Sequence, residues 1–352
     1  MSNGLHTYDT ADLTVVEIQT DDGITGYGMG RPRAGEGEIR GQFLRMLIGR
    51  DPLMTEAIWE FLWSPKLYGR RGNETRALSS IDLALWDIKA KRAGLPLFQL
   101  LGGYRTELPF YIAGGYYGRD KGIRELQEEM SSYVELGARA VKMKVGAVPI
   151  ADDVARVRAV RESIGNDVEL LLDANCAYRA SEAIRFAKRV EEFRPYWFEE
   201  PVQPDDYDGY RTVAAATWIQ LAGGENEYTK HGFRDLLATS AVGVINPDAR
   251  YMGGPTEFMK VAAMAQARGV DVCPHGDQQA HLHVLAAIPN GSWLEYYPKQ
   301  VKHMASASFL TPPVMTDRGT ILVPQQPGAG MDPAFEALEP HRIGRSEHTV
   351  SQ

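Results

Sequence analysis

The sequence has few cysteines and no long apolar segment, and each absence excludes a class of protein. Only two of its 352 residues are cysteine, Cys176 and Cys273, too few for the disulfide framework of a small secreted protein. No run of about 18 apolar residues occurs, so no transmembrane helix is expected. The first 30 residues lack a basic stretch followed by an apolar one, so no signal peptide is visible. We therefore expect a cytoplasmic protein with no membrane partner.

Positive charge is also scarce. The chain has 38 Lys and Arg residues against 46 Asp and Glu residues, a net charge of −8, and no run of basic residues. This balance argues against a nucleic-acid partner, which would require a basic surface. An anionic substrate would have to be attracted by local cations, because the overall field repels it.

The first part of the chain, residues 1–105, is expected to form a small α+β capping domain. Two β-rich segments flank Asp21-Asp22-Gly23, and Asp-Gly is a strong signal for a tight hairpin turn. Apolar residues at 3–4 spacing then predict three helices. The expected strands are 13–20 and 24–30, and the expected helices are 36–49, 53–66 and 73–93.

From residue 106 onward, strand and helix patterns alternate, which predicts parallel strands with helical crossovers. Eight such strands favour a (β/α)8 barrel of the TIM type over residues 106–310. The expected strands are 107–115, 138–146, 168–175, 196–201, 219–226, 242–250, 270–276 and 291–298. Residues 311–352 are rich in Pro and Gly and are expected to pack back against the capping domain.

Three carboxylates end successive barrel strands. The intervals from Asp173 to Glu199 and from Glu199 to Glu225 are both 26 residues, about the length of one strand and its crossover helix. The carboxyl ends of barrel strands surround one pocket, which is the catalytic face of this fold. Three hard oxygen ligands without Cys or His favour Mg2+ over Zn2+. The spacing therefore predicts a magnesium site in an enzyme.

The other strand ends carry candidate acids and bases. Lys142 and Lys144 alternate on one strand, so both can face the barrel mouth. A second ammonium group and a metal nearby would lower the pKa of Lys144 and make it a better base. Asp248 and His275 end neighbouring strands, and a hydrogen bond between them would fix the imidazole tautomer. Glu295 lies on the last strand.

Several polar residues near the predicted mouth have a more ordinary interpretation. Arg119, Lys121 and Arg250 are candidates for binding a distal carboxylate, although solvated surface charge is the commoner outcome. His281 and His283 do not share a helix face at their spacing, so we interpret them as structural residues rather than as a metal pair.

Taken together, these segments resemble the mandelate racemase subgroup of the enolase superfamily. The resemblance covers almost the whole chain, and the joint order of the motifs makes it specific. They are ALSSIDLALWDIKAKRAGLPLFQLLGG (77–103), VKMKVG (141–146), LLDAN (171–175), FEEP (198–201), GEN (224–226), NPD (246–248), PHG (274–276) and WLEYYP (293–298).

The resemblance assigns a role to each residue of the predicted site. It implies a modified, enolase-like barrel with one Mg2+ ion, Lys144 and His275 as the acid/base pair, and Asp248 as the partner of His275. It further implies that Lys142 and Glu295 assist at the substrate carboxylate and that Asn175 contacts a substrate hydroxyl. The metal ligands would be Asp173, Glu199 and Glu225. A symmetric homo-oligomer, often an octamer, is also implied.

Two longer segments resemble the tartrate-dehydratase branch of this subgroup, residues 112–150 and 273–288. They favour a Mg2+-dependent dehydratase of a hydroxy acid or sugar acid, tartrate-like or aldonate- or aldarate-like. Such an enzyme abstracts the α-proton of a bound carboxylate, passes through an enediolate and loses the β-hydroxyl. A racemase or epimerase would use the same residues, so that alternative stays open. A barrel that only binds a small-molecule carboxylate is an alternative of a different class.

Overall fold

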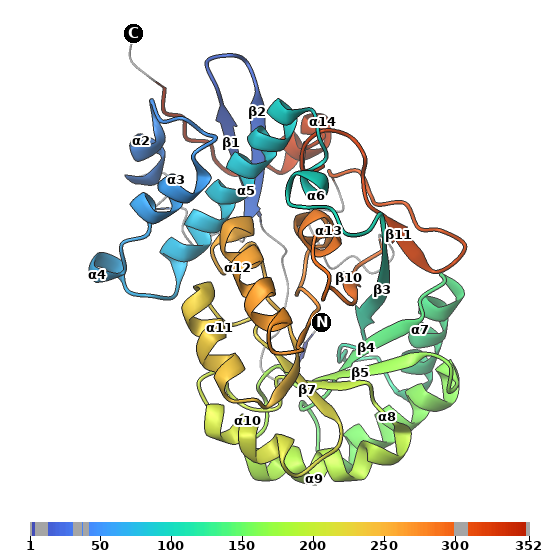
Figure 1. Ribbon diagram of the computed structural model, residues 1–352. Helices are drawn as coiled ribbons and strands as arrows, with labels where there is room; N and C mark the ends of the chain where they lie inside the picture. The colour runs from blue at the N-terminus through green and yellow to red at the C-terminus, as the bar shows by residue number, and fades with distance from the viewer. Residues whose placement is uncertain (1, 4–12, 31–36, 38–41, 299–308, 350–352) are drawn as a thin grey trace.

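The computed structural model describes residues 2–3, 13–30, 37, 42–298 and 309–349. Within these ranges the chain forms an N-terminal α+β unit and a barrel of alternating strands and helices (Figure 1). Part of the helix expected at 36–49 lies outside the described residues, and its described end contains the short helix α2 (Leu44–Leu47).

The N-terminal unit is built on a hairpin and a long helix. Strands β1 (Thr14–Gln19) and β2 (Thr25–Gly30) pair antiparallel, as the Asp-Gly turn predicts. Helix α5 (Asn73–Ala93) covers the hairpin and has the bounds expected from its apolar pattern. The helix expected at 53–66 is divided into α3 (Thr55–Leu62) and α4 (Pro65–Tyr68), because proline cannot continue a helix but starts one well.

Eight parallel strands form the barrel. Their order is β3, β4, β5, β6, β7, β8 and β9 in sequence, with β10 paired to β3. A parallel bridge between Val272 and Gly291 joins β9 to the segment before β10 and closes the ring. The strands are β3 (Glu107–Gly114), β4 (Ala140–Lys144), β5 (Glu169–Asp173), β6 (Trp197–Glu199), β7 (Gln220–Gly223), β8 (Val242–Ile245), β9 (Asp271–Val272) and β10 (Leu294–Tyr296).

Helices surround the strands on the outside, and side chains from the strands fill the interior of the barrel. In Figure 1 the helices α7 to α12 form an arc around the sheet. Inside the ring, Tyr111, Trp197 and Cys273 are fully buried in one apolar cluster, so the interior is a packed core and not a channel. The helices are α7 (Ile123–Glu135), α8 (Ile150–Ile164), α9 (Ala180–Val190), α10 (Tyr207–Ala214), α11 (Thr229–Ala238), α12 (Gly254–Gln266) and α13 (Gln278–Ala286).

The C-terminal segment contacts both units. Strand β11 (Thr320–Leu322) pairs antiparallel with β3 of the barrel. Further on, Ala329 and Met331 enter an apolar cluster with Met29 and Leu83 of the N-terminal unit. The segment also contains α14 (Phe335–Leu338), and another short helix, α6 (Leu97–Leu100), links α5 to the barrel.

The N-terminal unit is fastened to the barrel where helix α12 begins. Asp82 on α5 accepts hydrogen bonds from both the backbone N–H and the hydroxyl of Thr256, each at 2.8 Å. One turn earlier on α5, the Ser79 hydroxyl accepts from the Gly253 N–H at 2.8 Å. These contacts hold the loop between β8 and α12, which lies at the mouth of the barrel.

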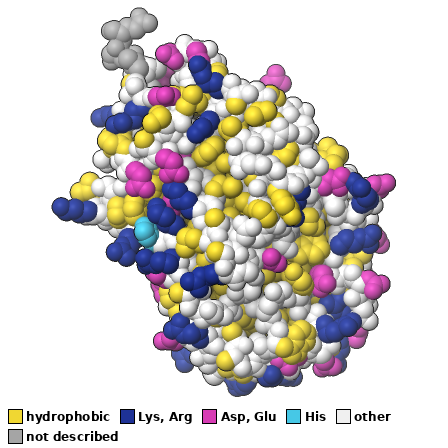
Figure 2. Space-filling model, viewed as in Figure 1, with side chains coloured by type: hydrophobic (Ala, Val, Ile, Leu, Met, Phe, Trp, Pro, Cys, Tyr) yellow, Lys and Arg dark blue, Asp and Glu magenta, His cyan; other side chains and the backbone are white. Residues whose placement is uncertain are grey.

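No helix within the described residues is both long enough and apolar enough to cross a membrane. On the face drawn in Figure 2, basic and acidic side chains are interspersed around the rim of the molecule.

Candidate active site

Three carboxylates meet at the carboxyl ends of β5, β6 and β7. The strand register places Asp173 beside Glu199 and beside Lys144 on the other side, so these side chains form one row across β4, β5 and β6. Glu225 follows β7 and completes the group. One oxygen atom from each of Asp173, Glu199 and Glu225 lies within 4.8 Å of the others. Glu200 is not part of this group; its Oε1 accepts from the Asn226 side chain at 2.7 Å.

The three carboxylates fit a divalent cation. Among the described residues, Glu199 Oε1 and Glu225 Oε2 are buried without a hydrogen-bond partner, although a buried polar atom usually has one. Burial and the neighbouring Asp173 raise the pKa of Glu199 to about 8, despite the opposing effect of Lys142. A hard cation with a preference for oxygen would relieve this crowding and bind the free oxygens.

Lys144 lies at the Asp173 side of the group. Its ammonium contacts the Asp173 carboxylate and stands 5.2 Å from the centre of the Tyr116 ring. We expected Lys142 to lower the pKa of Lys144. Burial, the largest influence, and Lys142 do act in that direction, but Asp173, Tyr116 and Glu225 together outweigh them, so the pKa of Lys144 lies above its ordinary value. Lys142 therefore acts in the expected direction, and the lowered pKa of Lys144, which we expected from Lys142 together with a metal, stays a prediction.

Lys142 lies deeper than Lys144. Its ammonium is 3.0 Å from Glu199 Oε2 and 2.9 Å from Glu295 Oε1, and its side chain is 1% exposed. Glu295 also accepts from the Tyr297 hydroxyl at 2.9 Å and from the Gly276 N–H. Burial alone would raise the pKa of Glu295, but Lys142 and the other cations lower it to about 2. The pair forms an ionised support beneath the carboxylates, and its contact with substrate stays a prediction.

His275 faces the carboxylates from the opposite side. Its Nε2 is 3.4 Å from Glu225 Oε2, and its Nδ1 is 3.1 Å from Asp248 Oδ2. The side chains of His275 and Glu225 are 14% and 15% exposed, so both reach the mouth. Burial alone would lower the pKa of His275, but Glu225 and the hydrogen bond with Asp248 raise it above its ordinary value.

Asn175 lies at the rim in a left-handed backbone conformation, with φ of 42°. Its backbone N–H donates to Asp173 Oδ1 at 2.8 Å, which fixes the orientation of that carboxylate. Its side-chain oxygen accepts from the Asn3 amide at 3.0 Å. No pattern in the sequence predicted Asn3 near the site, because the contact joins residues 172 positions apart.

The three arginine and lysine candidates for a distal carboxylate have different surroundings. Lys121 contacts Glu129 and donates to the Tyr116 carbonyl oxygen at 2.7 Å. Arg250 turns inward onto Asp248 and is 4% exposed. Its position two residues after Asp248 is the signal that could have predicted this local pair. Arg119 is exposed on the loop that follows β3.

The two histidines on α13, which we interpreted as structural residues, are both buried. His281 Nε2 accepts from the Ala249 N–H at 2.9 Å, and its Nδ1 is 2.8 Å from the Asp277 carbonyl oxygen. The ring therefore supports the loop that carries Asp248.

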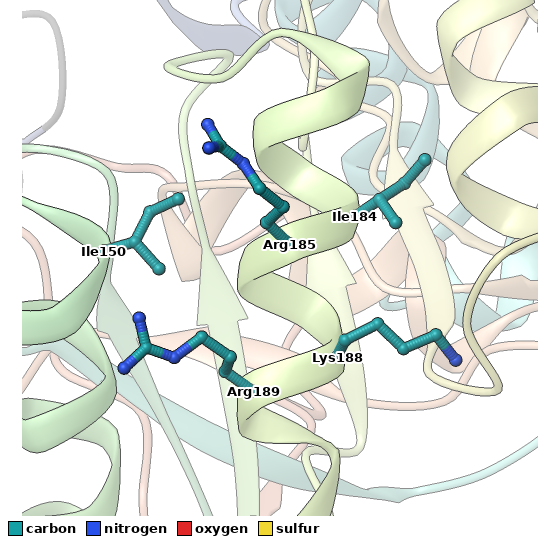
Figure 3. A pocket seen from close by; sticks show the side chains of 5 residues that line it. All are labelled: Ile150, Ile184, Arg185, Lys188 and Arg189. Carbon is teal, nitrogen blue, oxygen red and sulfur yellow. The ribbon is translucent and has the colours of Figure 1, made fainter.

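Two cavities lie outside this group of residues. One of about 450 Å³ is on the outer helical layer between α8 and α9 (Figure 3), lined by Ile150, Ile184, Arg185, Lys188 and Arg189. Its lining residues include none of the residues predicted for the active site. A smaller one of about 230 Å³ adjoins Tyr116 and Lys121 after β3, on the Lys144 side of the mouth.

The comparisons with known proteins agree with this architecture. Residues 1–102 match the sequence profile of the mandelate racemase / muconate lactonizing enzyme N-terminal domain, and residues 125–337 match that of the enolase C-terminal domain-like family. A crystal structure of a racemase from Streptomyces coelicolor A3(2) with bound magnesium superposes with a TM-score of 0.86, at 33% identity, covering 93% of this chain and 91% of that one.

Curated relatives at similar identity have more than one activity. The arabinonate dehydratase of Saccharolobus solfataricus is 33% identical over 91% of this chain and 87% of its own length. The 3,6-anhydro-alpha-L-galactonate cycloisomerase of Streptomyces coelicolor is 34% identical over 95% and 92%. The L-talarate/galactarate dehydratase of Salmonella typhimurium is 35% identical over 81% and 73%.

Proposed function

Because the chain belongs to the mandelate racemase / muconate lactonizing enzyme family of the enolase superfamily, we propose that it is a hydro-lyase that dehydrates a sugar acid with Mg2+ as cofactor. The observation that carries the proposal is the group of three carboxylates between Lys144 and the Asp248–His275 pair. Two of the relatives described above are sugar-acid dehydratases, which supports this reaction over the others of the family.

In the proposed reaction, different residues act on two opposite faces of the substrate. Asp173, Glu199 and Glu225 would hold the cation. When bound, Mg2+ would draw charge from Asp173 and stabilise the negative charge that develops on the substrate carboxylate. Lys144 takes the α-proton as the C–H bond breaks.

His275 acts on the other face. As an imidazolium it gives a proton to the β-hydroxyl, and the carbon–oxygen bond breaks to release water. The enol that remains tautomerises to a 2-keto-3-deoxy acid. Asp248 keeps the imidazole in the tautomer with the proton on Nδ1, and Asn175 lies at the rim where a substrate hydroxyl can contact it. A homo-oligomeric state is part of the same proposal.

The test is to incubate the protein and Mg2+ with a library of aldonic and aldaric acids, including tartrates. We expect formation of a 2-keto-3-deoxy acid from at least one member, measured as its semicarbazone, and loss of this product in the Glu225→Gln variant. If no acid in the library yields a keto acid, the dehydratase proposal is wrong.

A cycloisomerase is the second candidate, because one relative of equal similarity catalyses such a reaction. It starts with the same α-proton abstraction but does not release water. Lactones and anhydro-sugar acids therefore belong in the library. A 2-keto-3-deoxy acid that is isomeric with a lactone or anhydro-sugar acid, formed because the ring oxygen leaves the β-carbon in place of water, would identify a cycloisomerase. In D2O, inversion of the recovered substrate with α-deuterium and no keto acid would identify a racemase.

A further inference from the structure

We propose that Arg250 is a positioning residue that holds Asp248 in the one orientation in which its Oδ2 meets His275. The proposal rests on the proposed function, since it explains how the His275 side of the site is kept ready to donate its proton. The sequence placed Arg250 among candidates for substrate binding, and the geometry assigns it a different task.

Arg250 holds both oxygens of the Asp248 carboxylate. Its Nη2 is 2.6 Å from Oδ2, and its Nε is 3.0 Å from Oδ1. Its backbone N–H also donates to Oδ1, at 2.8 Å. A bidentate guanidinium–carboxylate pair is planar and directional. This pair of hydrogen bonds from Nε and Nη2, called the fork below, therefore fixes the rotation of the carboxylate. It leaves Oδ2 in place to accept from His275 Nδ1 at 3.1 Å.

Gly276, next to His275 in the sequence, leaves the space that the Arg250 guanidinium occupies. A Cβ atom at Gly276 would lie 2.1 Å from Arg250 Nη2, so any other residue there would displace the fork. The Arg250 residue is 4% exposed. It is therefore placed to act on Asp248 rather than on a substrate in the mouth.

Asp248 has a second histidine neighbour that would compete for it. His281 Nε2 is 3.5 Å from Asp248 Oδ1, but the lone pair of this nitrogen accepts from the Ala249 N–H, so the neutral ring has no proton there to donate to the carboxylate. Arg250 Nε donates to this Oδ1 instead. Without the fork, the carboxylate is free to rotate away from His275, and the imidazole loses its fixed orientation.

The variants Arg250→Lys and Arg250→Met test this role. Lysine keeps the charge but cannot form the fork, whereas methionine removes the charge and preserves much of the volume. Arg161→Lys is the matched control, because Arg161 is a half-buried arginine that donates to the backbone carbonyls of Phe193, Gly165 and Val168. It should lower the melting temperature without touching the site.

Two rates are measured in D2O on a substrate that the wild type dehydrates. The first is keto-acid formation, which needs both sides of the site, and the second is α-deuterium exchange into recovered substrate, which needs only Lys144. In both Arg250 variants we expect kcat for dehydration to fall about 10- to 100-fold, as for a misplaced catalytic group, with exchange reduced less than about threefold. KM should change little, and Arg161→Lys should keep the wild-type ratio of the two rates.

A substrate-independent measurement separates this proposal from the proposed function. In protein labelled with 15N-histidine, the Nδ1–H signal of His275 is identified by its loss in His275→Asn. It should be sharp in wild type and Arg161→Lys, and broadened or absent in Arg250→Lys. An unchanged signal overturns the positioning role, whether or not a substrate is known.

The kinetic outcomes are equally decisive. Parallel loss of exchange and dehydration, or no loss of either, would mean that Arg250 is only structural. A rise in KM confined to dicarboxylate substrates would make it a substrate ligand. If the wild type converts no acid while the His275 signal responds as expected, the proposed function fails and the positioning role stands.

Discussion

His283 shows how far burial alone can change a side chain. It lies on α13 and is 2% exposed, and its Nδ1 accepts from the Phe98 N–H at 3.2 Å. Burial lowers its pKa from 6.5 to about 4. The folded state therefore holds the neutral ring in a pH range where the unfolded chain binds a proton.

This difference predicts a pH-dependent stability. A lowered folded pKa means that the contribution is complete above pH 6.5 and is lost as the pH falls from 6.5 towards 4. The full loss is about 3 kcal/mol. His283→Gln keeps an acceptor for Phe98 but does not titrate. Between pH 7.5 and pH 4.5 the wild type should therefore lose about 3 kcal/mol of unfolding free energy relative to the variant. Urea unfolding at several pH values measures it, and parallel curves would contradict the assignment.

At the residue scale, the functional side chains at the strand ends could be predicted from the sequence, whereas the groups that they contact often could not. Asp173, Glu199 and Glu225 follow from a spacing that any barrel imposes, and the structure brings them together. The ionic partners of Lys144 do not follow from spacing. The pKa of Lys144 depends on its distance to Asp173 across a strand pair, which opposes the effect that we inferred from Lys142.

At the scale of elements, the contact between α5 and α12 determines how the N-terminal unit meets the barrel. Gly254 begins α12 with φ of +76°, and a Cβ atom there would lie 2.4 Å from Asp82 Oδ2. Gly254→Ala should therefore combine backbone strain with a broken Asp82–Thr256 contact and cost about 2–4 kcal/mol.

Gly269→Ala is the control for this variant. Gly269 has φ of +68°, but a Cβ atom there would meet no atom within 4 Å, so only the strain of about 1–2 kcal/mol is expected. Chemical unfolding of both variants measures the two costs. Equal losses would show that the Asp82 contact does not contribute.

The long helix and the hairpin could be predicted from local patterns, whereas the hydrogen bonds that attach them to the rest of the molecule could not. The bounds of α5 follow from its apolar spacing and its final glycine. Its two buried aspartates give no such signal. Asp82 binds a residue 174 positions away, and Asp87 accepts from the backbone N–H groups of Tyr27 and Ala329. Such pairs depend on the assembled fold.

For the whole molecule, a cation at the three carboxylates would tie together strands β5 and β6 and the loop after β7. A ligand that binds only the folded state stabilises it by RT ln(1 + [L]/Kd), about 2.7 kcal/mol at 100 times Kd. We therefore expect Mg2+ to raise the melting temperature by several degrees. Differential scanning calorimetry with and without Mg2+ measures the shift, after chelator treatment to remove bound metal.

Two variants of the loop after β7 separate the cation site from general charge effects. Glu225→Gln removes one carboxylate of the group, and a tenfold weaker affinity would reduce the stabilisation by about 1.4 kcal/mol. Glu227→Gln also removes a buried negative charge two residues away, but Glu227 faces Tyr207 and Arg71 and should keep the full Mg2+ shift. The same shift in both variants would place the cation elsewhere. No shift in the wild type would remove the metal from the proposed reaction and favour a barrel that binds its ligand without catalysis.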